Sequence, residues 1–129
     1  MKVLLDTQVL LWFALADPQL SGPAMTLIMD QAYEKVVSPA SYWEIAIKIS
    51  IGKYALSQPY EVFMDAAIGQ NGFGYLHIEP KHTAALITLP FHHKDPFDRL
   101  LATQALVEGI PVVSTDTIFD QYGIQRIWE

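Results

Sequence analysis

Two acidic residues stand where two apolar runs end. Asp6 directly follows the run at residues 3–5, and Asp116 comes shortly after the run at residues 112–113. The carboxyl ends of parallel strands line one crevice in which ligands bind, so both carboxylates are expected at the same place. Hydroxyl groups at 114–115 can orient a carboxylate or hold a water. Carboxylates that gather without basic partners repel one another unless a divalent cation neutralises them. The pattern therefore predicts a metal site of oxygen ligands, which indicates phosphate chemistry.

Glu44 is a third acid that can join this site. It stands three residues after Ser41, which is the spacing of a helix capping box, and Lys48 follows at i+4, where it can form an ion pair. Its immediate neighbours are nevertheless apolar, which indicates a largely buried helix. A buried carboxylate needs a compensating interaction, so a ligand role stays open beside the capping role.

Asp98 is the fourth candidate, and it competes with Asp95. The segment Asp95-Pro96-Phe97-Asp98 predicts a helix that Asp95 caps and that has an acid in its first turn. We favour Asp98 as the metal ligand. Asp95 is then a structural cap that can also support the site without binding the metal directly. The sequence leaves open which of the two binds the metal. Asp6 has a similar alternative as an N-cap, although Thr7 can cap equally well.

The histidines and the basic residues give weaker indications. None of the histidines has the spacing of a zinc motif: His77, His82, His92 and His93. The loop at 92–94 carries His92, His93 and a lysine beside the predicted site, where a solvated loop is favoured over phosphate contact. Further candidates for substrate contact are Lys48, Lys53 and Arg99, although each is most simply a surface charge.

The overall composition limits the classes of protein to consider. The chain has 129 residues, of which 51% are hydrophobic and 17% charged, which predicts one folded domain over residues 1–129. The absence of cysteine excludes disulfides, thiolate zinc sites and a cysteine nucleophile, and it fits a reducing compartment. The net charge of −6 argues against a broad basic surface for nucleic acid but suits a basic protein partner. Neither a signal peptide nor a membrane span is visible, so we expect a soluble cytoplasmic protein.

Hydrophobic patterns and breaker residues predict an alternation of strands and helices. Strands are expected at 2–5, 36–37, 75–78, 110–113 and 124–128, and helices at 8–15, 22–33, 41–51, 59–69, 80–89 and 96–108. This order is typical of an α/β fold with a parallel sheet covered by helices. Four aromatic residues are expected in the core: Trp12, Phe13, Tyr42 and Trp43.

With these residues established, the chain resembles the PIN-domain family, and specifically the VapC-type toxins of bacterial toxin–antitoxin pairs. The resemblance covers nearly the whole chain. Four segments in this order carry it: Leu4-Leu5-Asp6-Thr7, Ser41-Tyr42-Trp43-Glu44-Ile45-Ala46-Ile47-Lys48, Asp95-Pro96-Phe97-Asp98-Arg99-Leu100-Leu101-Ala102-Thr103-Gln104-Ala105 and Val113-Ser114-Thr115-Asp116-Thr117-Ile118-Phe119.

The resemblance implies a three-layer α/β/α fold around a central, mainly parallel sheet. It also implies an endoribonuclease that depends on Mg²⁺ or Mn²⁺ and hydrolyses RNA phosphodiester bonds. The acidic cluster of the family maps onto Asp6, Glu44, Asp98 and Asp116. A small antitoxin that blocks the site and a homodimer are implied as well. Gln8 departs from the histidine that close relatives often carry there, which leaves its role open.

Two other readings stay open. A signalling receiver domain is also an acidic, parallel α/β domain that binds Mg²⁺. It would carry an acidic pair after the first strand and a phosphoacceptor aspartate at the end of a middle strand, whereas Val36-Val37 is followed by Ser38-Pro39. The second reading is an inactive member of the PIN fold that serves as a binding module, against which the full set of four acids argues.

Overall fold

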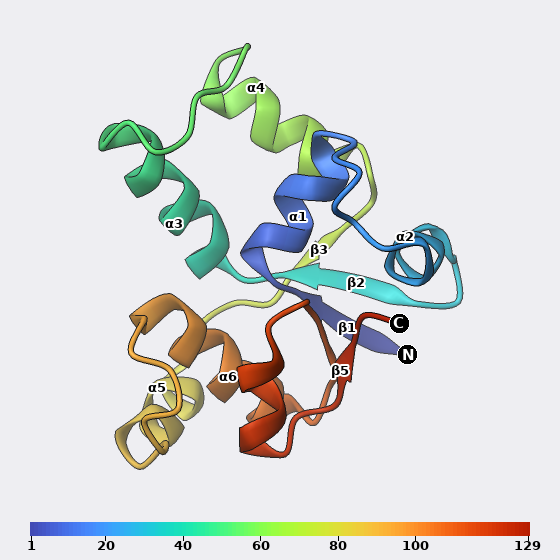
Figure 1. The fold of residues 1–129 in the computed structure, drawn as a ribbon. Helices are drawn as coiled ribbons and strands as arrows, with labels where there is room; N and C mark the ends of the chain where they lie inside the picture. Colours follow the sequence, from blue (N-terminus) through green and yellow to red (C-terminus); the bar gives the residue numbers. More distant parts are fainter.

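The computed structural model describes residues 1–129, and Figure 1 shows the arrangement of its elements. The strands are β1 (Lys2–Leu5), β2 (Glu34–Val37), β3 (Gly74–Tyr75), β4 (Val112–Val113) and β5 (Arg126–Ile127). The α-helices are α1 (Thr7–Ala14), α2 (Gly22–Met29), α3 (Pro39–Ser50), α4 (Tyr60–Met64), α5 (Pro80–Ile87) and α6 (Pro96–Glu108). A π-helical segment, η1 (Asp65–Gly69), continues α4, and a 3₁₀-helix, η2 (Thr117–Tyr122), precedes β5.

The five strands form one sheet in the order β3-β2-β1-β4-β5, and every neighbouring pair is parallel. The prediction of a mainly parallel sheet is therefore confirmed, and β1 lies at its centre. Because β1 lies between β2 and β4, its carboxyl end opens between the two halves of the sheet, where ligands bind in open α/β folds. The order also differs from the order 2-1-3-4-5 of receiver domains, so the receiver alternative loses its structural basis.

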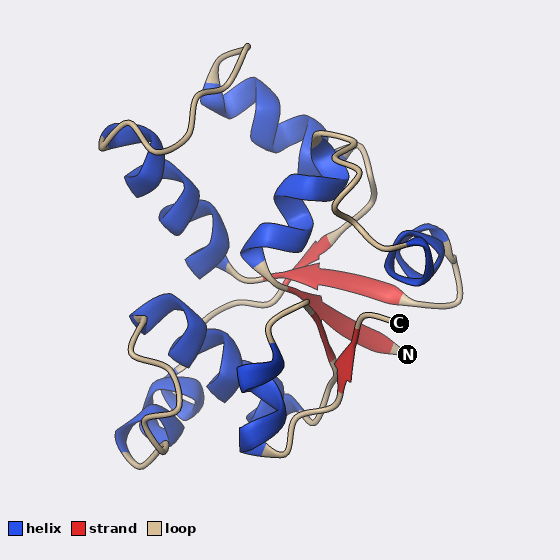
Figure 2. Cartoon of the chain, in the orientation of Figure 1, coloured by secondary structure: helices blue, strands red, loops and turns tan.

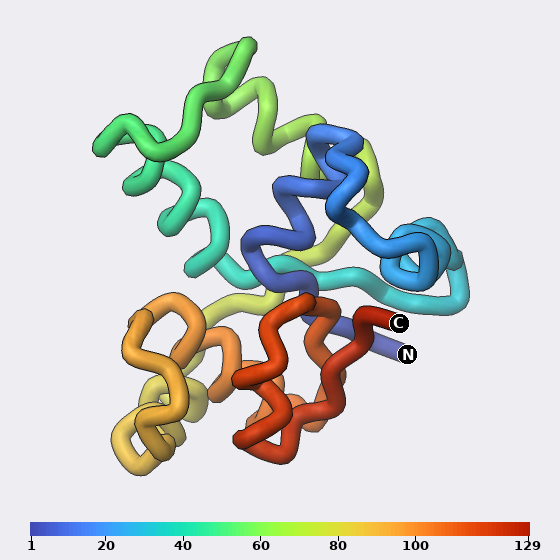
Figure 3. The backbone as a smooth tube through the Cα atoms, in the orientation of Figure 1, coloured from blue at the N-terminus to red at the C-terminus, as the bar shows by residue number.

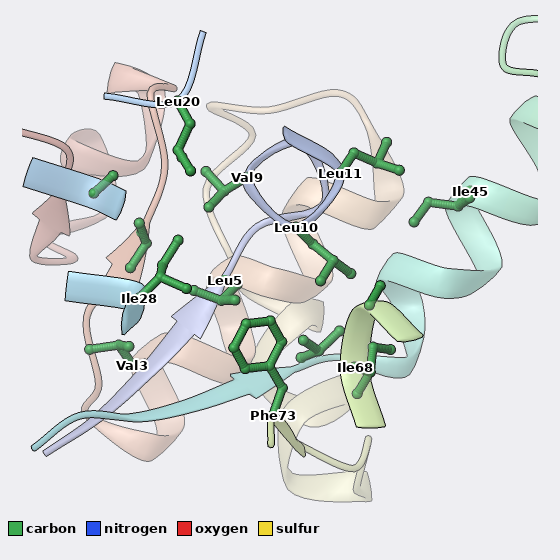
Figure 4. Packing of buried hydrophobic residues seen from close by; sticks show 14 of the residues in the cluster. Val3, Leu5, Val9, Leu10, Leu11, Leu20, Ile28, Ile45, Ile68 and Phe73 are labelled. Carbon is green, nitrogen blue, oxygen red and sulfur yellow. The ribbon is translucent and has the colours of Figure 1, made fainter. Parts of the chain in front are cut away.

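Helices cover both faces of the sheet, as Figure 2 shows. Successive strand residues point to opposite faces, so Leu5 joins one buried cluster and Leu4 another. The first cluster packs the sheet against α1, α2 and η1, and Figure 4 shows part of it around Leu10, Ile68 and Phe73. The second packs the other face against α6 and η2. Two cores on one sheet make three layers, and the predicted α/β/α fold is confirmed.

The chain builds the two helical layers one after the other, as its path in Figure 3 shows. The segments from α1 to η1 cover one face, and α5, α6 and η2 cover the other. Residues that approach the carboxyl edge of the sheet from both faces are therefore far apart in sequence. They can meet only because β1 and β4 are neighbours.

The predicted start of α3 is wrong. Ser38 is the N-cap, its hydroxyl accepts a hydrogen bond from the backbone N–H of Ala40, and Pro39 is the first helical residue. A serine followed by proline is a strong start signal, since proline has the right φ and needs no donor at this position. Ser41 is thus buried inside the helix, where it accepts a hydrogen bond from the Thr7 hydroxyl at 3.0 Å. Glu44 is consequently not a capping-box residue.

Two other predictions need correction. Helix α2 ends at Met29 instead of continuing to residue 33, because Asp30 adopts an extended backbone and its carboxylate accepts a hydrogen bond from the N–H of Ala32. Trp43 is 62% exposed and is not a core residue. Its ring packs edge-on against the ring of Phe97, with 5.4 Å between the ring centroids, on the outer surface where α3 and α6 meet.

Candidate metal centre

All four predicted acids line one small cavity at the carboxyl edge of the sheet. Its volume is about 210 Å³. The residues around it are Asp6, Thr7, Gln8, Glu44, Lys48, Tyr54, Asp95, Asp98, Thr115 and Asp116. They come from the segments that follow β1 and β4, from the start of α1, from α3 and the loop after it, and from the N-terminal end of α6. The structure thus brings together the side chains that the sequence singled out, together with Asp95.

Asp6 lies at the bottom of this acidic cavity and is only 7% exposed. It caps α1, since its Oδ1 accepts a hydrogen bond from the backbone N–H of Val9 at 2.8 Å. Its other oxygen, Oδ2, accepts a short hydrogen bond from the hydroxyl of Ser114. Burial raises the pKa of Asp6 from 3.8 to about 6. The two hydrogen bonds lower the pKa, but their effect is smaller than that of burial, and the charges of Asp116 and Glu44 raise it further. Asp6 therefore combines the capping role with a place in the cavity.

Asp98 is partly buried, and its carboxylate has neither a hydrogen-bond donor nor a cation as partner in the structure. Asp95 is the N-cap of α6, as predicted, because its Oδ1 accepts the backbone N–H groups of Phe97 and Asp98 at 2.8 and 3.1 Å. Burial raises the pKa of Asp98 from 3.8 to about 7, and the charge of Asp95 is the next largest cause. An unpaired carboxylate of this kind is free to bind a cation in the cavity.

Glu44 is the one acid of the set that pairs with a lysine. Its side chain is 9% exposed, and Lys48 lies 3.0 Å from its Oε2, so the ion pair expected at i+4 is confirmed. The hydrogen bond to Glu44 is the main reason why the pKa of Lys48 is raised. Lys48 lines the cavity and keeps part of its side chain exposed, which places one positive charge at the edge of a negatively charged site.

Asp116 is held by a histidine that the sequence reasoning assigned to a solvated loop. His93 is 4% exposed, and its Nε2 lies 2.7 Å from Asp116 Oδ2. The other oxygen of Asp116 caps η2 by accepting the N–H of Ile118 at 3.0 Å. The loop prediction is wrong for His93, although it holds for the exposed His92. The usable signal was the position of His93 two residues before the cap of α6.

The other basic candidates do not reach the cavity. Arg99 is buried, and its guanidinium donates to the carbonyl groups of Leu86, Leu89 and Pro90 at the end of α5. It is thus a structural residue, contrary to the prediction of a surface charge. Lys53 is exposed and does not line the cavity, whereas Gln8 does line it.

The donor set fits a hard divalent cation. Carboxylate oxygens are what Mg²⁺ and Mn²⁺ prefer, and Mg²⁺ needs only one or two of them because it keeps several waters. Two of the carboxylates, Asp6 and Asp98, have raised pKa values and no cation partner. Burial is the main cause of these raised pKa values and repulsion between the acids adds to it, and a divalent ion would compensate both by pairing with the charged carboxylates. In addition, ligand atoms of His93, Asp98 and Asp116 all lie within 4.8 Å of one another.

Comparison with known proteins identifies the family. Residues 3–125 match the PIN domain. The chain belongs to the PIN-domain family. No significant match was found among curated proteins.

Three solved structures share the fold. VapBC2 from Rickettsia felis, bound to a DNA fragment from its promoter, aligns with a TM-score of 0.75 and 14% identity over 100% of both chains. VapBC-1 from nontypeable Haemophilus influenzae aligns with a TM-score of 0.65 and 18% identity over 98% of this chain and 97% of that one. FitAcB from Neisseria gonorrhoeae aligns with a TM-score of 0.66 and 15% identity over 97% and 96%. At these identities the similarity establishes the fold. None of the helices has both the length and the apolar character needed to cross a membrane.

Proposed function

We propose that this protein is a metal-dependent endoribonuclease of the VapC type, the toxin of a toxin–antitoxin pair. The observation that carries the proposal is the acidic cavity of a PIN-domain chain, in which Asp6 and Asp98 have raised pKa values and no cation partner. Such a site is built for a divalent ion, and divalent ions support phosphodiester hydrolysis. The resemblance of four sequence segments to VapC-type toxins supports the choice of RNA as substrate.

Asp6 and Asp98 are the proposed direct ligands of Mg²⁺ or Mn²⁺, and Glu44 and Asp116 complete the set directly or through water. When bound, the ion would stabilise the negative charge on the attacked phosphate and make water a stronger nucleophile. Asp6 is fixed for this role by Ser114 and by the start of α1. Either Glu44 or Asp116 can orient the attacking water and accept its proton, since both line the same cavity. Lys48 at the edge of the cavity can contact a phosphate.

The proposal includes the partners that the resemblance implied. A small antitoxin would cover the acidic site, and the net charge of −6 suits a partner with basic side chains. We also propose that residues 1–129 form a single nuclease domain, that the toxin is a homodimer and that it acts in the cytoplasm, where its RNA substrate and a reducing environment are found. Light scattering of the purified protein tests the dimer.

The decisive experiment is RNA cleavage with matched variants. Purified protein is incubated with total cellular RNA in Mg²⁺, in Mn²⁺ and in EDTA, beside Asp6→Asn and the control Asp65→Asn. Asp65 is exposed on η1, outside the cavity, so its variant makes the same chemical change without touching the site. We expect discrete products from wild type and Asp65→Asn that require metal and disappear in Asp6→Asn.

The result that contradicts the proposal is equally clear. Products that are identical in wild type and Asp6→Asn arise from contamination and not from this site. Wild-type protein that binds Mn²⁺ but cleaves no RNA favours the inactive binding module instead.

A further inference from the structure

His93 lies behind the acidic cavity in a position that the nuclease proposal does not use. It precedes α6, and its buried ring packs against Phe119 at 4.8 Å and stacks on Tyr122 at 5.5 Å, with ring planes 18° apart. Both nitrogens of the ring have polar partners. Nε2 lies 2.7 Å from Asp116 Oδ2, and Nδ1 lies 3.0 Å from the Tyr122 hydroxyl. The ring thus connects the hydroxyl of Tyr122 to a carboxylate that lines the cavity.

The hydrogen bonds around Tyr122 determine which nitrogen of His93 carries the proton. The hydroxyl of Tyr122 accepts a hydrogen bond from the backbone N–H of His93 at 2.9 Å. The only acceptor that the structure offers for its own proton is Nδ1 of the same residue. Nδ1 is therefore an acceptor, and Nε2 carries the hydrogen and donates it to Asp116. Tyr122 contacts His93 at both the backbone and the ring, so it fixes the position of the ring, and it favours the same tautomer that the Asp116 carboxylate requires.

Asp116 is consequently held at both of its oxygens. His93 donates to Oδ2, and the N–H of Ile118 donates to Oδ1. The backbone N–H of Asp116 donates to Ser114 Oγ at 3.0 Å, and that hydroxyl donates in turn to Asp6. Each carboxylate oxygen of Asp116 still has a lone pair free, and the side chain is 32% exposed. The network therefore fixes the direction of the carboxylate without blocking it.

We propose that His93 is a positioning residue, held by Tyr122, which orients Asp116 toward the metal without itself binding the metal. The inference rests on the proposed function, since it assigns a role toward the same ion. Outer partners of this kind fix the orientation of a ligand and increase its affinity for the metal. Tyr122, His93, Asp116 and the ion would then form one line from the core to the cavity.

The rival role for His93 is direct coordination, because its ligand atom lies within 4.8 Å of those of Asp98 and Asp116. Coordination through Nε2 would require this nitrogen to give up its hydrogen and the contact with Asp116. Coordination through Nδ1 would require the ring to leave Tyr122. The two roles therefore differ in whether a histidine nitrogen is bound to the ion.

The first experiment needs no metal. Long-range ¹H–¹⁵N spectra of the metal-free, ¹⁵N-histidine-labelled protein report the tautomer of His93. We expect the Nε2–H form alone in wild type, because the Asp116 carboxylate can only accept a hydrogen bond from Nε2 and the Tyr122 hydroxyl donates to Nδ1. A spectrum that shows the Nδ1–H form overturns the assigned directions of these hydrogen bonds.

The second experiment measures the affinity for Mn²⁺ by calorimetry, which does not depend on RNA cleavage. We expect His93→Ala to weaken binding by about 10–100-fold, as loss of an outer partner does in other metal sites. His93→Gln keeps a donor near the position of Nε2 and should recover part of the loss. The matched control is His77→Ala, which removes an exposed histidine outside the cavity and should bind as wild type does.

A double-mutant cycle decides whether His93 acts through Asp116. If it does, His93→Ala adds little to the loss in Asp116→Ala, so the two losses are not additive. Additive losses, an unchanged affinity in His93→Ala, or a histidine-nitrogen coupling in the electron-nuclear double-resonance spectrum of the Mn²⁺ protein would each overturn the proposal. Wild-type protein that binds no Mn²⁺ contradicts the proposed metal site and the His93 inference together. Normal binding in wild type and in His93→Ala contradicts the inference alone.

Discussion

Two clusters in this molecule each contain a buried histidine and two acids, but only one of them also contains a lysine that pairs with the acids. In the first, His93 contacts Asp116 near Asp98. In the second, His82 contacts Glu108 near Glu79, and the Nε2–Oε2 distance is 2.9 Å. The histidines are 4% and 0% exposed. The similarity of the contacts shows that a buried histidine beside a carboxylate does not by itself indicate a functional site.

The difference lies in the compensating cations. Lys81 is 3.0 Å from Glu108 and 3.8 Å from Glu79, so one lysine pairs with both acids of the second cluster, which connects α5 to α6. His82 and Lys81 hold the pKa of Glu108 below its ordinary value. Around the cavity, Lys48 pairs with Glu44 alone, and the pKa values of Asp6 and Asp98 are raised. An acidic cluster that lacks its own cations, and not the presence of a histidine, identifies the site that needs a metal.

The largest expected effect is on catalysis. Asp98→Asn should reduce metal-dependent RNA cleavage by more than about 100-fold, since it removes a proposed ligand and outer partners alone cost about 10–100-fold. Glu108→Gln, which alters the lysine-paired second cluster, should cleave RNA as wild type does at temperatures at which the variant is folded. Gel assays of both variants provide the measurement. Full activity in Asp98→Asn together with an inactive Asp95→Asn would show that Asp95 is the ligand instead.

The second prediction concerns the stability that the lysine-paired second cluster provides. His82→Ala should lower the free energy of unfolding by about 2–4 kcal/mol, because it leaves a cavity and removes a fully buried ring. It also removes the acceptor of the Glu79 N–H at the start of α5. Urea denaturation should show a lower midpoint with an unchanged m-value. An unchanged midpoint would contradict the structural role, and a specific loss of Mn²⁺ affinity would indicate a second metal site.

The third prediction is a gain in stability at the acidic cavity. Without metal at pH 8, Asp98→Asn should raise the free energy of unfolding by about 1–2 kcal/mol, which is less than the full pKa shift implies because solvent screens this partly exposed group. The matched variant Asp65→Asn should change little. Thermal unfolding in EDTA measures the difference. A lower melting temperature for Asp98→Asn would mean that its carboxylate is stabilising and not repelled.

The smallest effect is the pH dependence, which should have opposite signs in the two clusters. The folded-state pKa values of Asp6 and Asp98 lie above the ordinary value of 3.8, so their contribution to stability is complete below pH 3.8 and is lost as the pH rises through about 6 and about 7. Glu108 has a lowered pKa, so its contribution is present above its ordinary value of 4.5 and is lost on acidification below it.

A pH series in EDTA separates these contributions. The metal-free protein should become more stable between pH 8 and pH 5, and this gain should be smaller in Asp98→Asn. Saturating Mn²⁺ should reverse the trend, because the metal binds the deprotonated carboxylates. A metal-free protein whose stability is constant from pH 8 to pH 5 would contradict the raised pKa values.

Local sequence signals determined much of the fold and the identity of the four acids. Helix α6 begins and ends where Asp95-Pro96 and Gly109 predict, and β1 covers the predicted residues 2–5. These predictions succeed because caps, prolines and apolar alternation act within a few residues of the chain. The alternation of strands and helices likewise predicts a parallel sheet, and therefore a common edge for Asp6 and Asp116.

Only the tertiary structure decided which polar residues are buried and what each one contacts. His93 occupies a loop whose sequence looks solvated, yet η2 covers its ring. Arg99 is enclosed by the end of α5, and Trp43 remains exposed because the apolar side of α3 lies elsewhere. Ser114 meets Asp6 across 108 residues of sequence. Burial and ion pairing depend on contacts between distant segments, so the sequence could name the acids of the site but not the charge balance that distinguishes it.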